Sequence, residues 1–259
     1  MNLKDKVIFV TGAGQGIGRA TSLLLSSKYG ATIAALDNNG ETVQKVVNEI
    51  KANNGEAIAL VADITDRAAI KGAVDRIIAT YGRIDVLYNN AAMGGYCKML
   101  EASDEFYDRL MDVNVKGSFI VATEVAKVMI PLRKGRIIQV SSIAGIQTTA
   151  NNGVYGMSKA AVKVMAQALA LELGEYNISA VTIHPGNVKI EKLHAHYVNT
   201  AKKLGITTEE YYKKKEAEVP LGRLAEMEDI AEVVAFLSSE ESYYIDGCSI
   251  AISGGRVLY

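Results

Sequence analysis

Short apolar segments rich in valine, isoleucine and alanine alternate with longer amphipathic segments along the 259-residue chain. This alternation is typical of βα units, in which helices cover a parallel sheet. Most of the apolar segments are continuous, as expected for strands that are buried on both faces. The pattern predicts an α/β fold with strands at Val7–Thr11, Thr32–Asp37, Ala57–Ala62, Val86–Asn89, Arg136–Ser141, Ser179–His184 and Ser249–Ile252.

The segment between residues 186 and 221 interrupts this alternation. It follows the sixth predicted strand and contains Thr208–Glu218, a charged stretch that carries adjacent tyrosines. Long irregular connections in compact proteins are usually functional or disordered. We therefore expect one domain over residues 1–259, in which the segment 186–221 is a lid over the substrate.

Composition and charge exclude several classes of protein. Lys and Arg total 28 and Asp and Glu total 29, so no basic bias points to nucleic acid or to an anionic membrane. No apolar stretch approaches the ~20 residues of a membrane span, and the first residues lack the features of an export signal. We expect a cytoplasmic protein without a nucleic-acid or membrane partner. Cys97 and Cys248 form no CxxC pair, which predicts free thiols and no zinc site.

A glycine-rich turn follows the first predicted strand, where residues 11–18 read TGAGQGIG. Such a turn allows a pyrophosphate to approach backbone N–H groups and the positive end of the following helix. Taken alone, the same motif also fits an ordinary tight turn between a strand and a helix.

Asp37 strengthens the interpretation of the turn as a dinucleotide site. It ends the second predicted strand, about 20 residues after the last glycine, where a carboxylate accepts hydrogen bonds from the adenosine ribose. The same carboxylate repels a 2′-phosphate. None of the neighbouring positions that could receive this phosphate is basic: Ala13, Gln15, Asn38 and Asn39. The sequence therefore predicts NAD(H) rather than NADP(H).

Tyr155 and Lys159 are four residues apart in a predicted helix, so their side chains lie on one face. A phenol has an ordinary pKa near ~10, which is too high for a base at neutral pH. A nearby ammonium and the positive charge of NAD⁺ favour the phenolate and lower this pKa. Ser142 lies at the end of the fifth predicted strand, where its hydroxyl can bond a reacting carbonyl oxygen. The conjunction of these residues predicts alcohol oxidation or ketone reduction.

Several motifs resemble, in order and spacing, those of the short-chain dehydrogenase/reductase family over nearly the whole chain. They are Thr11–Gly18, Asn89-Asn90-Ala91-Ala92, Asn114, Ser142, Tyr155-x-x-x-Lys159 and Pro185-Gly186. The resemblance implies a Rossmann-type, doubly wound, seven-stranded parallel sheet with helices on both faces. It also implies a homotetramer that interconverts a secondary alcohol and a ketone with NAD.

The resemblance further implies a role for each catalytic residue. Tyr155 is the general acid/base, and Ser142 polarises and orients the substrate oxygen. Lys159 binds the nicotinamide ribose and lowers the pKa of Tyr155, and Asn114 holds a water that links Lys159 to a proton relay. The residues expected to contact the cofactor are Gly12, Gln15, Gly16, Ile17, Gly18, Asp37, Asp63, Ile64, Asn90, Tyr155, Lys159, Pro185 and Val188.

Among these cofactor residues, Asp63 is expected at the adenine and Asn90 along the cleft. One position departs from the family pattern. After the Pro-Gly pair the family commonly has Val-x-Thr, whose hydroxyl bonds the nicotinamide carboxamide, whereas this chain has Ile190 in place of the threonine. An isoleucine cannot make that bond, so the carboxamide requires a backbone group such as the Val188 N–H or another residue. Ala92 replaces a glycine of the Asn-Asn-Ala-Gly motif, a change we expect to be minor.

The charged residues of the lid leave two interpretations of the substrate open. His184, His194 and His196 cluster where the lid begins, and lysines follow at Lys189, Lys192, Lys202, Lys203 and Lys213–Lys215. A solvated amphipathic helix explains these residues, because glutamates nearly balance the lysines. An anionic or polyhydroxylated substrate explains them as well. His194 and His196 are two apart and do not share a helix face, which argues against a metal site.

The carboxyl-terminal part resembles sorbitol-6-phosphate 2-dehydrogenases at Lys203–Ile206, Val219–Leu221, Ser242-Tyr243 and Gly254–Val257. The ending and the turn 221–224 also resemble acetoin/2,3-butanediol dehydrogenases. We expect a sugar alcohol or its phosphate as substrate. Alternatives are an acetoin/2,3-butanediol dehydrogenase, a hydroxysteroid dehydrogenase and a 3-oxoacyl-acyl-carrier-protein reductase. A non-catalytic NAD-sensing module is also an alternative, although it needs no catalytic Ser, Tyr and Lys.

Overall fold

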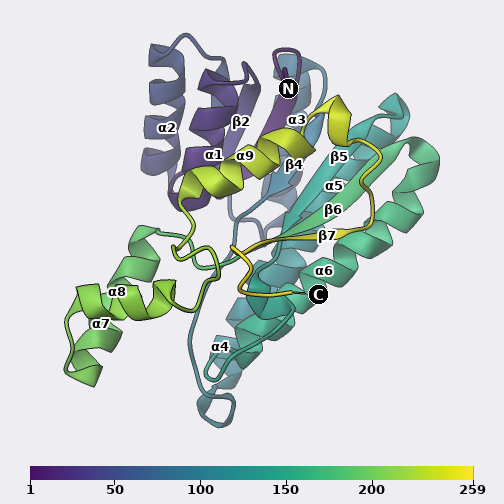
Figure 1. Cartoon of the computed structure of the whole chain (residues 1–259). Helices are drawn as coiled ribbons and strands as arrows, with labels where there is room; N and C mark the ends of the chain where they lie inside the picture. Colours follow the sequence, from purple (N-terminus) through teal and green to yellow (C-terminus); the bar gives the residue numbers. More distant parts are fainter. Residues whose placement is uncertain (259) are drawn as a thin grey trace.

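The predicted apolar segments form one parallel sheet in the computed structural model, which describes residues 1–258. Within these residues the sheet has seven strands in the order β3-β2-β1-β4-β5-β6-β7 (Figure 1). The predicted doubly wound α/β fold is therefore confirmed, and the predicted strand ends differ by one residue at β3, β5 and β6. The strands are β1 (Val7–Thr11), β2 (Thr32–Asp37), β3 (Ala57–Val61), β4 (Val86–Asn89), β5 (Gly135–Val140), β6 (Ile178–Pro185) and β7 (Ser249–Ile252).

Helices cover both faces of the sheet because successive strand residues point to opposite sides. In β1, Phe9 belongs to the apolar core with α3, α5 and α6, whereas Ile8 belongs to the core with α1, α2 and α9. All of these core residues are buried from solvent. The helices are α1 (Gly16–Ser27), α2 (Gly40–Ala52), α3 (Arg67–Tyr81), α4 (Asp104–Met111), α5 (Ser118–Met129), α6 (Gly153–Leu173), α7 (Glu191–Leu204), α8 (Thr208–Glu216) and α9 (Met227–Leu237).

The order of the strands reverses between β1 and β4. The chain moves outward from β1 to β2 and β3 on one side, then returns to pair β4 with β1 on the other. In a parallel sheet the crevice at such a reversal, beyond the carboxyl ends of the strands, is the usual ligand site. The glycine-rich turn after β1 and the residues after β4 border this crevice.

The segment 186–221 is largely helical, which corrects the expectation of an irregular connection. It contains α7 and α8, which Figure 1 shows as a pair of helices standing out from the sheet. The Thr207 side chain caps α8, and the Glu210 side chain reaches back to the Thr207 backbone N–H, so the first turn is locally stabilised. Tyr197 and Tyr211 pack together in a small apolar cluster that is separate from the two cores of the sheet.

None of the helices within residues 1–258 is both long enough and apolar enough to cross a membrane.

Candidate active site

Glycine is required twice in the turn after β1. Gly12 has a φ of +65°, a region that side chains rarely adopt. A Cβ on Gly18 would lie 2.1 Å from the carbonyl oxygen of Gly12, so no larger residue fits there. Gln15 precedes α1 without capping it through its side chain, and Gly16, Ile17 and Gly18 form the first turn. The free N–H groups of this turn can therefore bind a pyrophosphate.

Asp37 lies buried beside the glycine turn, at the end of β2. Its Oδ2 accepts a hydrogen bond from the Gly14 N–H at 2.9 Å, and its Oδ1 accepts one from the Asn39 N–H at 3.0 Å. These two bonds hold the carboxylate in one orientation. An ionised carboxylate has about four acceptor positions, so capacity remains for the two hydroxyls of a ribose.

Asp63 and Ile64 follow β3 at the same edge of the sheet. The Asp63 Oδ1 accepts from the backbone N–H and the hydroxyl of Thr65, both at 2.8 Å. The Ile64 side chain is buried in the core, and a Cβ on Gly117 would lie 2.7 Å from its Cδ1. The Ile64 side chain is thus taken up by the core, whereas Asp63 is exposed beside it.

Asn90 ties the end of β4 to the glycine turn. Its Nδ2 donates to the carbonyl oxygen of Thr11 at 3.0 Å, and its backbone N–H donates to the Thr11 hydroxyl at 3.0 Å. On the other side of the crevice, Pro185 ends β6 and the buried Val188 forms an isolated parallel bridge with Ala225. These contacts fix both walls of the cofactor crevice.

Ile190 borders the same crevice. A Cβ on Gly16 would lie 4.0 Å from the Ile190 Cγ2, with no other contact within 4 Å from the described residues. Gly16 therefore faces open space bounded by the isoleucine. The residue that departs from the family pattern supplies an apolar wall where a hydroxyl was expected.

Ser142, Tyr155 and Lys159 come together beyond the end of β5. Ser142 caps the short 3-10 turn Ile143–Gly145, accepting a bond from the Ala144 N–H at 3.2 Å. Tyr155 and Lys159 lie on α6, with the Lys159 Nζ 5.8 Å from the centroid of the Tyr155 ring. The Lys159 Nζ donates to the Val140 carbonyl oxygen at 2.8 Å. An ammonium has three donors, so further hydrogen bonds remain for a ligand.

Burial dominates the acid–base properties of this trio. It raises the pKa of Tyr155 to about 12, against the opposing effect of the Ser142 hydroxyl. It lowers the pKa of the Lys159 ammonium to about 8. The expectation is that Lys159, together with the positive charge of NAD⁺, lowers the pKa of Tyr155; in the chain without cofactor, burial has the largest influence on that pKa.

Asn114 is buried in a π-helical turn, Asp112–Gly117, between α4 and α5. Its side-chain oxygen accepts from the Met93 N–H at 2.7 Å, and its Nδ2 donates to the Met93 carbonyl at 2.9 Å and to the Ser158 hydroxyl at 3.0 Å. The side chain thus joins the loop after β4 to α6. This geometry makes Asn114 a positioning residue, and π-helical turns of this kind are frequent at functional sites.

Several polar residues at the carboxyl ends of the strands support the site and were not singled out from the sequence in this role. The Nδ1 of buried His184 lies 2.9 Å from the carbonyl oxygen of Ser142, and the Ser141 hydroxyl donates to the Lys159 carbonyl at 2.7 Å. Thr11 donates to the Asn89 side chain at 3.1 Å. The sequence feature that could have identified them is a polar residue at the end of an otherwise apolar strand. Such a residue is buried by the sheet and therefore requires a hydrogen-bond partner.

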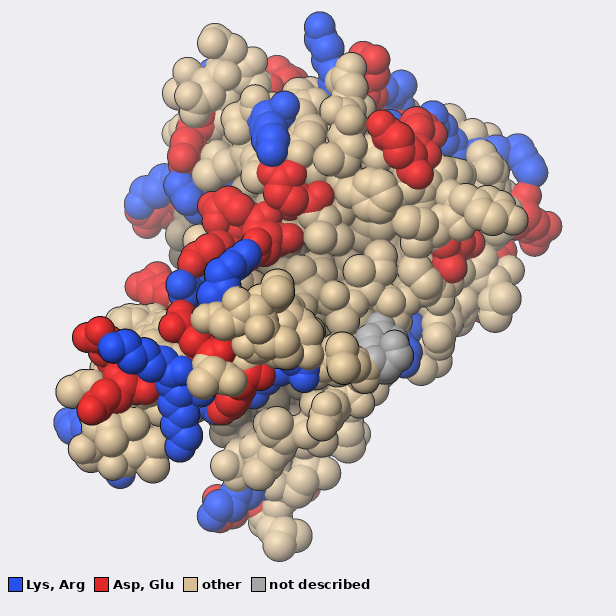
Figure 2. All heavy atoms as spheres, viewed as in Figure 1, with Lys and Arg blue, Asp and Glu red and all other residues tan. Residues whose placement is uncertain are grey.

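Most of the charged lid residues are engaged with their neighbours. Lys189 pairs with Glu226 at 2.8 Å, and the Nδ1 of His194 lies 3.1 Å from the Tyr212 hydroxyl. His196 stacks on Tyr96, which comes from the loop after β4, with ring centroids 4.2 Å apart. Figure 2 shows acidic and basic side chains interspersed over α7 and α8. The solvated-helix interpretation therefore describes much of the lid surface.

Lys192 contacts the loop after β4, where its Nζ lies 3.5 Å from the Gly94 carbonyl oxygen. Lys202 and Lys203 lie in the last turn of α7. Cations at the carboxyl end of a helix interact favourably with the helix dipole.

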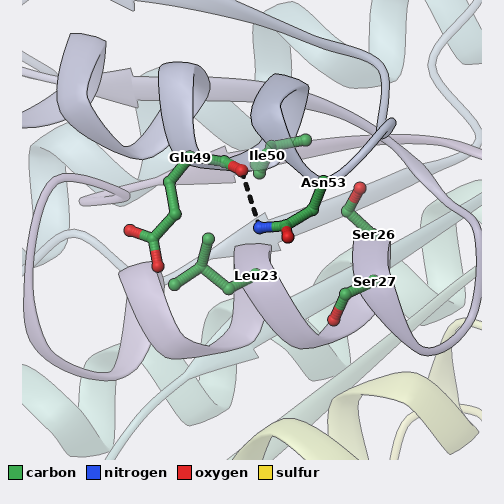
Figure 3. Close-up of a pocket in the computed structure, with 6 residues that line it drawn as sticks. All are labelled: Leu23, Ser26, Ser27, Glu49, Ile50 and Asn53. Carbon is green, nitrogen blue, oxygen red and sulfur yellow. Dashed lines mark hydrogen bonds between the residues drawn. The ribbon is translucent and has the colours of Figure 1, made fainter.

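A cavity of about 150 Å³ lies between α1 and α2 (Figure 3), and none of its lining residues belongs to the catalytic trio. Glu49 and Asn53 line it, and the Asn53 side chain donates to the Glu49 carbonyl at 2.9 Å. This cavity contributes nothing to the crevice described above. Within residues 1–258, no three His, Cys, Asp or Glu side chains gather in a group that could hold a metal ion.

Comparison with known proteins agrees with the architecture of the site. The family described as short chain dehydrogenase matches residues 6–200. The chain is 37% identical to a 3-oxoacyl-acyl-carrier-protein reductase of Thermotoga maritima, with 100% of each chain covered. It is 36% identical to a 2,3-dihydro-2,3-dihydroxybenzoate dehydrogenase of Bacillus subtilis, covering 99% of this chain and 97% of that one.

Among solved structures, an NAD⁺-bound xylitol dehydrogenase superposes with a TM-score of 0.92 at 32% identity, covering 98% of this chain and 100% of that chain. The protein belongs to the short-chain dehydrogenase family and is an oxidoreductase. The resemblance of the carboxyl-terminal part to sorbitol-6-phosphate dehydrogenases has no counterpart among these relatives.

Proposed function

We propose that this protein is an NAD-dependent dehydrogenase that interconverts a secondary alcohol and a ketone, with a sugar alcohol or sugar-alcohol phosphate as its substrate. The observation that carries the proposal is the placement of Ser142, Tyr155 and Lys159 beside the crevice between β1 and β4. Asp37 holds the opposite end of the same crevice.

The crevice fits NAD. The N–H groups at the start of α1 would hold the pyrophosphate, the buried Asp37 carboxylate would hold the adenosine ribose, and the remaining donors of Lys159 would hold the nicotinamide ribose. When bound, NAD accepts or returns the hydride. The side chain of Ile190 cannot anchor the carboxamide by a hydrogen bond, so the Val188 N–H would hold it.

The catalytic residues handle the proton and the substrate oxygen. Ser142 donates a hydrogen bond to that oxygen, and the Tyr155 oxygen accepts the hydroxyl proton during oxidation or returns it during reduction. Because burial raises the pKa of Tyr155 to about 12 in the chain alone, oxidation at neutral pH requires added positive charge. Lys159 beside the phenol would supply part of that charge, and bound NAD⁺ would add to it.

The polyol assignment is favoured over reduction of acyl-carrier-bound 3-oxo groups by two features. The xylitol dehydrogenase superposes over nearly the entire chain, and Asp37 disfavours the 2′-phosphate of NADP. The Thermotoga maritima relative keeps the 3-oxoacyl reductase alternative open. Acetoin, butanediol and steroid alcohols are further alternatives.

A homotetramer fits the exposed apolar residues on the helices that flank the sheet, and the cytoplasm is the location that we propose for it. On α6, Val164 is 61% exposed and Leu171 is 87% exposed, and on the neighbouring α5 Phe119 is 48% exposed. The seven-residue spacing of Val164 and Leu171 places them on one helix face. Such a face is suited to packing against another copy of the chain.

The test is a substrate panel followed by NADH absorbance. It includes xylitol, sorbitol, sorbitol 6-phosphate, 2,3-butanediol, a hydroxysteroid and a 3-oxoacyl thioester, each with NAD(H) and NADP(H). We expect the highest kcat/KM for a polyol or its phosphate with NAD⁺. Turnover restricted to the 3-oxoacyl thioester with NADPH would overturn both the substrate and the cofactor assignments.

A further inference from the structure

We propose that Arg256 is a specificity-determining residue whose guanidinium binds an anionic oxygen group, a carboxylate or a phosphate, on the substrate away from the reacting carbon. The proposal deepens the proposed function and rests on it for the identity of the reacting alcohol. Arg256 lies in the turn after β7, outside the motifs that define the catalytic and cofactor sites.

The turn that carries Arg256 is fixed against the end of the lid. The Leu221 N–H donates to the Gly254 carbonyl at 3.2 Å. A Cβ on Gly254 would lie 2.7 Å from the Val219 Cγ1, so the backbone of the turn approaches the lid as closely as glycine allows. The Arg256 N–H donates to the Ser253 carbonyl at 3.2 Å. The guanidinium therefore has a defined position relative to the lid.

Arg256 belongs to a small cluster with an excess of positive charge. Its Nη2 donates to the Glu218 Oε2 at 2.6 Å, and the Lys215 Nζ donates to the Glu218 Oε1 at 2.7 Å. Two cations thus share one carboxylate. The side chains of Arg256 and Lys215 are only 19% and 22% exposed, so solvent screens their excess charge less than on an open surface.

The second terminal nitrogen of Arg256 has unused donors. Its Nη1 is buried and has no hydrogen-bond partner among residues 1–258. A buried donor without an acceptor is unfavourable, and such groups in folded proteins usually serve a ligand or a water. With Nη2 held by Glu218, Nη1 is oriented in advance to donate to an oxyanion. Arginine is suited to this role because its planar fork matches carboxylate and phosphate groups.

Tyrosines connect this cluster to the catalytic residue. Burial raises the pKa of Tyr96, and the positive charge of Arg256 opposes that rise. Tyr96 in turn adds a small contribution to the raised pKa of Tyr155, whose largest cause is burial. Tyr96 therefore lies within electrostatic reach of both Arg256 and Tyr155. Tyr96 also stacks on His196 of the lid, which joins the loop after β4 to the lid.

The proposal is tested with matched pairs of substrates that differ only in the distal group. The pairs are sorbitol 6-phosphate with sorbitol, and a sugar acid with the corresponding sugar alcohol. The variant R256Q removes the positive charge, and R256K keeps the charge but loses the planar fork. The control R223Q removes an exposed arginine that forms a bidentate pair with Asp229.

We expect R256Q to lower the ratio of kcat/KM for the anionic substrate to that for its neutral partner by tenfold or more, the effect of about one lost charge-assisted hydrogen bond. R256K should lower it less, and R223Q should keep the wild-type ratio. The phosphate pair and the carboxylate pair show which anion the site prefers. An equal loss for charged and neutral substrates in R256Q, or no wild-type preference for either anion, would overturn the proposal.

Binding of inorganic phosphate, measured by calorimetry in wild type, R256Q and R256K, separates this inference from the proposed function. We expect weaker binding in R256Q even if the wild-type enzyme oxidises no polyol. Equal phosphate affinity in wild type and R256Q contradicts the role of Arg256. Phosphate binding lost in R256Q, together with failure of every polyol in the substrate panel, contradicts only the proposed reaction. Thermal unfolding of the variants confirms that each is folded.

Discussion

The carboxyl edge of the sheet and the lid hold their polar side chains in different ways. At the edge, Asp37, Asn114 and Lys159 are buried, and each makes hydrogen bonds to backbone groups of other elements. In the lid, Lys189 and Lys213 are more exposed and pair with nearby glutamates. The edge is therefore rigid and its geometry is set by the whole fold, whereas most lid charges contribute to a solvated surface.

We therefore expect the carboxyl edge of the sheet to carry out the reaction and the lid to contribute to the choice of substrate. Burial shifts the pKa values of Tyr155 and Lys159 at the edge, and we propose that these two groups act on the cofactor and the reacting oxygen. The lid packs around its own small cluster, in which the Tyr197 ring meets the Tyr211 ring edge to face at a centroid distance of 5.0 Å. Changes at the edge should alter turnover by large factors, and changes at the lid surface should alter little.

The largest expected effect is at Tyr155. Y155F removes the hydroxyl that exchanges a proton with the substrate, and we expect kcat to fall by about 10²–10⁴-fold. Because the ring remains, the Kd for NADH, measured by fluorescence titration, should stay within about threefold of the wild-type value. Retention of wild-type kcat in this variant would refute the assigned role of Tyr155.

The pH dependence of the wild-type reaction measures the protonation of the same Tyr155 hydroxyl. Oxidation needs the deprotonated phenol, and burial raises its pKa in the chain alone, so kcat/KM for oxidation should rise with pH from neutral conditions. Reduction needs the protonated phenol and should not rise over the same range. A profile for oxidation that falls between pH ~7 and ~9 would contradict this assignment.

The next effect concerns cofactor choice. Asp37→Ala, combined with Asn38→Arg, replaces the carboxylate with a cation near the adenosine ribose. We expect the ratio of kcat/KM for NAD⁺ to that for NADP⁺ to fall by about 100-fold or more, since a repulsive charge is exchanged for an attractive one. The matched control E41Q removes a nearby exposed carboxylate and should preserve the ratio. Equal use of both cofactors by the wild-type enzyme would contradict the premise.

Lys159 provides a stability test of the buried edge. Burial lowers the pKa of its ammonium from 10.5 to about 8 in the folded state, so the folded state binds fewer protons between these values and stability should rise as pH increases through that window. The lowered pKa corresponds to about 3 kcal/mol of unfavourable burial when the ammonium is charged. K159M should therefore abolish activity, raise the Tm at pH ~7 and lose this pH dependence.

Thermal unfolding of wild type and K159M at several pH values measures the effect, and K71M, a change at an exposed lysine, is the control. A lower Tm for K159M than for the wild-type enzyme would show that the ammonium stabilises the fold.

The smallest effect should come from the lid surface. Lys213 is exposed and lies 3.6 Å from Glu209 one helical turn away, so K213A should change stability by less than about 0.5 kcal/mol and KM by less than about twofold. Y211A removes a buried ring of the lid cluster and should raise KM while the NADH Kd stays unchanged. Similar KM values for the two variants would remove the distinction between the lid core and the lid surface.

The local sequence was sufficient to predict the strands and the glycine turn. It was also sufficient to predict that Asp37 follows the glycine turn and that Tyr155 and Lys159 lie together. Continuous apolar segments predict buried parallel strands, Asp37 follows the glycines at the distance of one βαβ unit, and Tyr155 and Lys159 share a helix face through a four-residue spacing. The capping box at Thr207 and Glu210 was also readable and would have predicted α8 in the lid. Each of these signals depends only on backbone geometry over a few turns or on a short βαβ connection.

Tertiary structure decided the features that depend on distant residues. The contact between His184 and Ser142 requires β5 and β6 to be paired, and that between Arg256 and Glu218 joins residues 38 positions apart. Asn114 became a positioning residue only because α4, α5 and α6 surround it. The upward shift of the Tyr155 pKa also depended on burial. Desolvation is set by the surrounding packing, and the spacing of two residues along a helix does not reveal it.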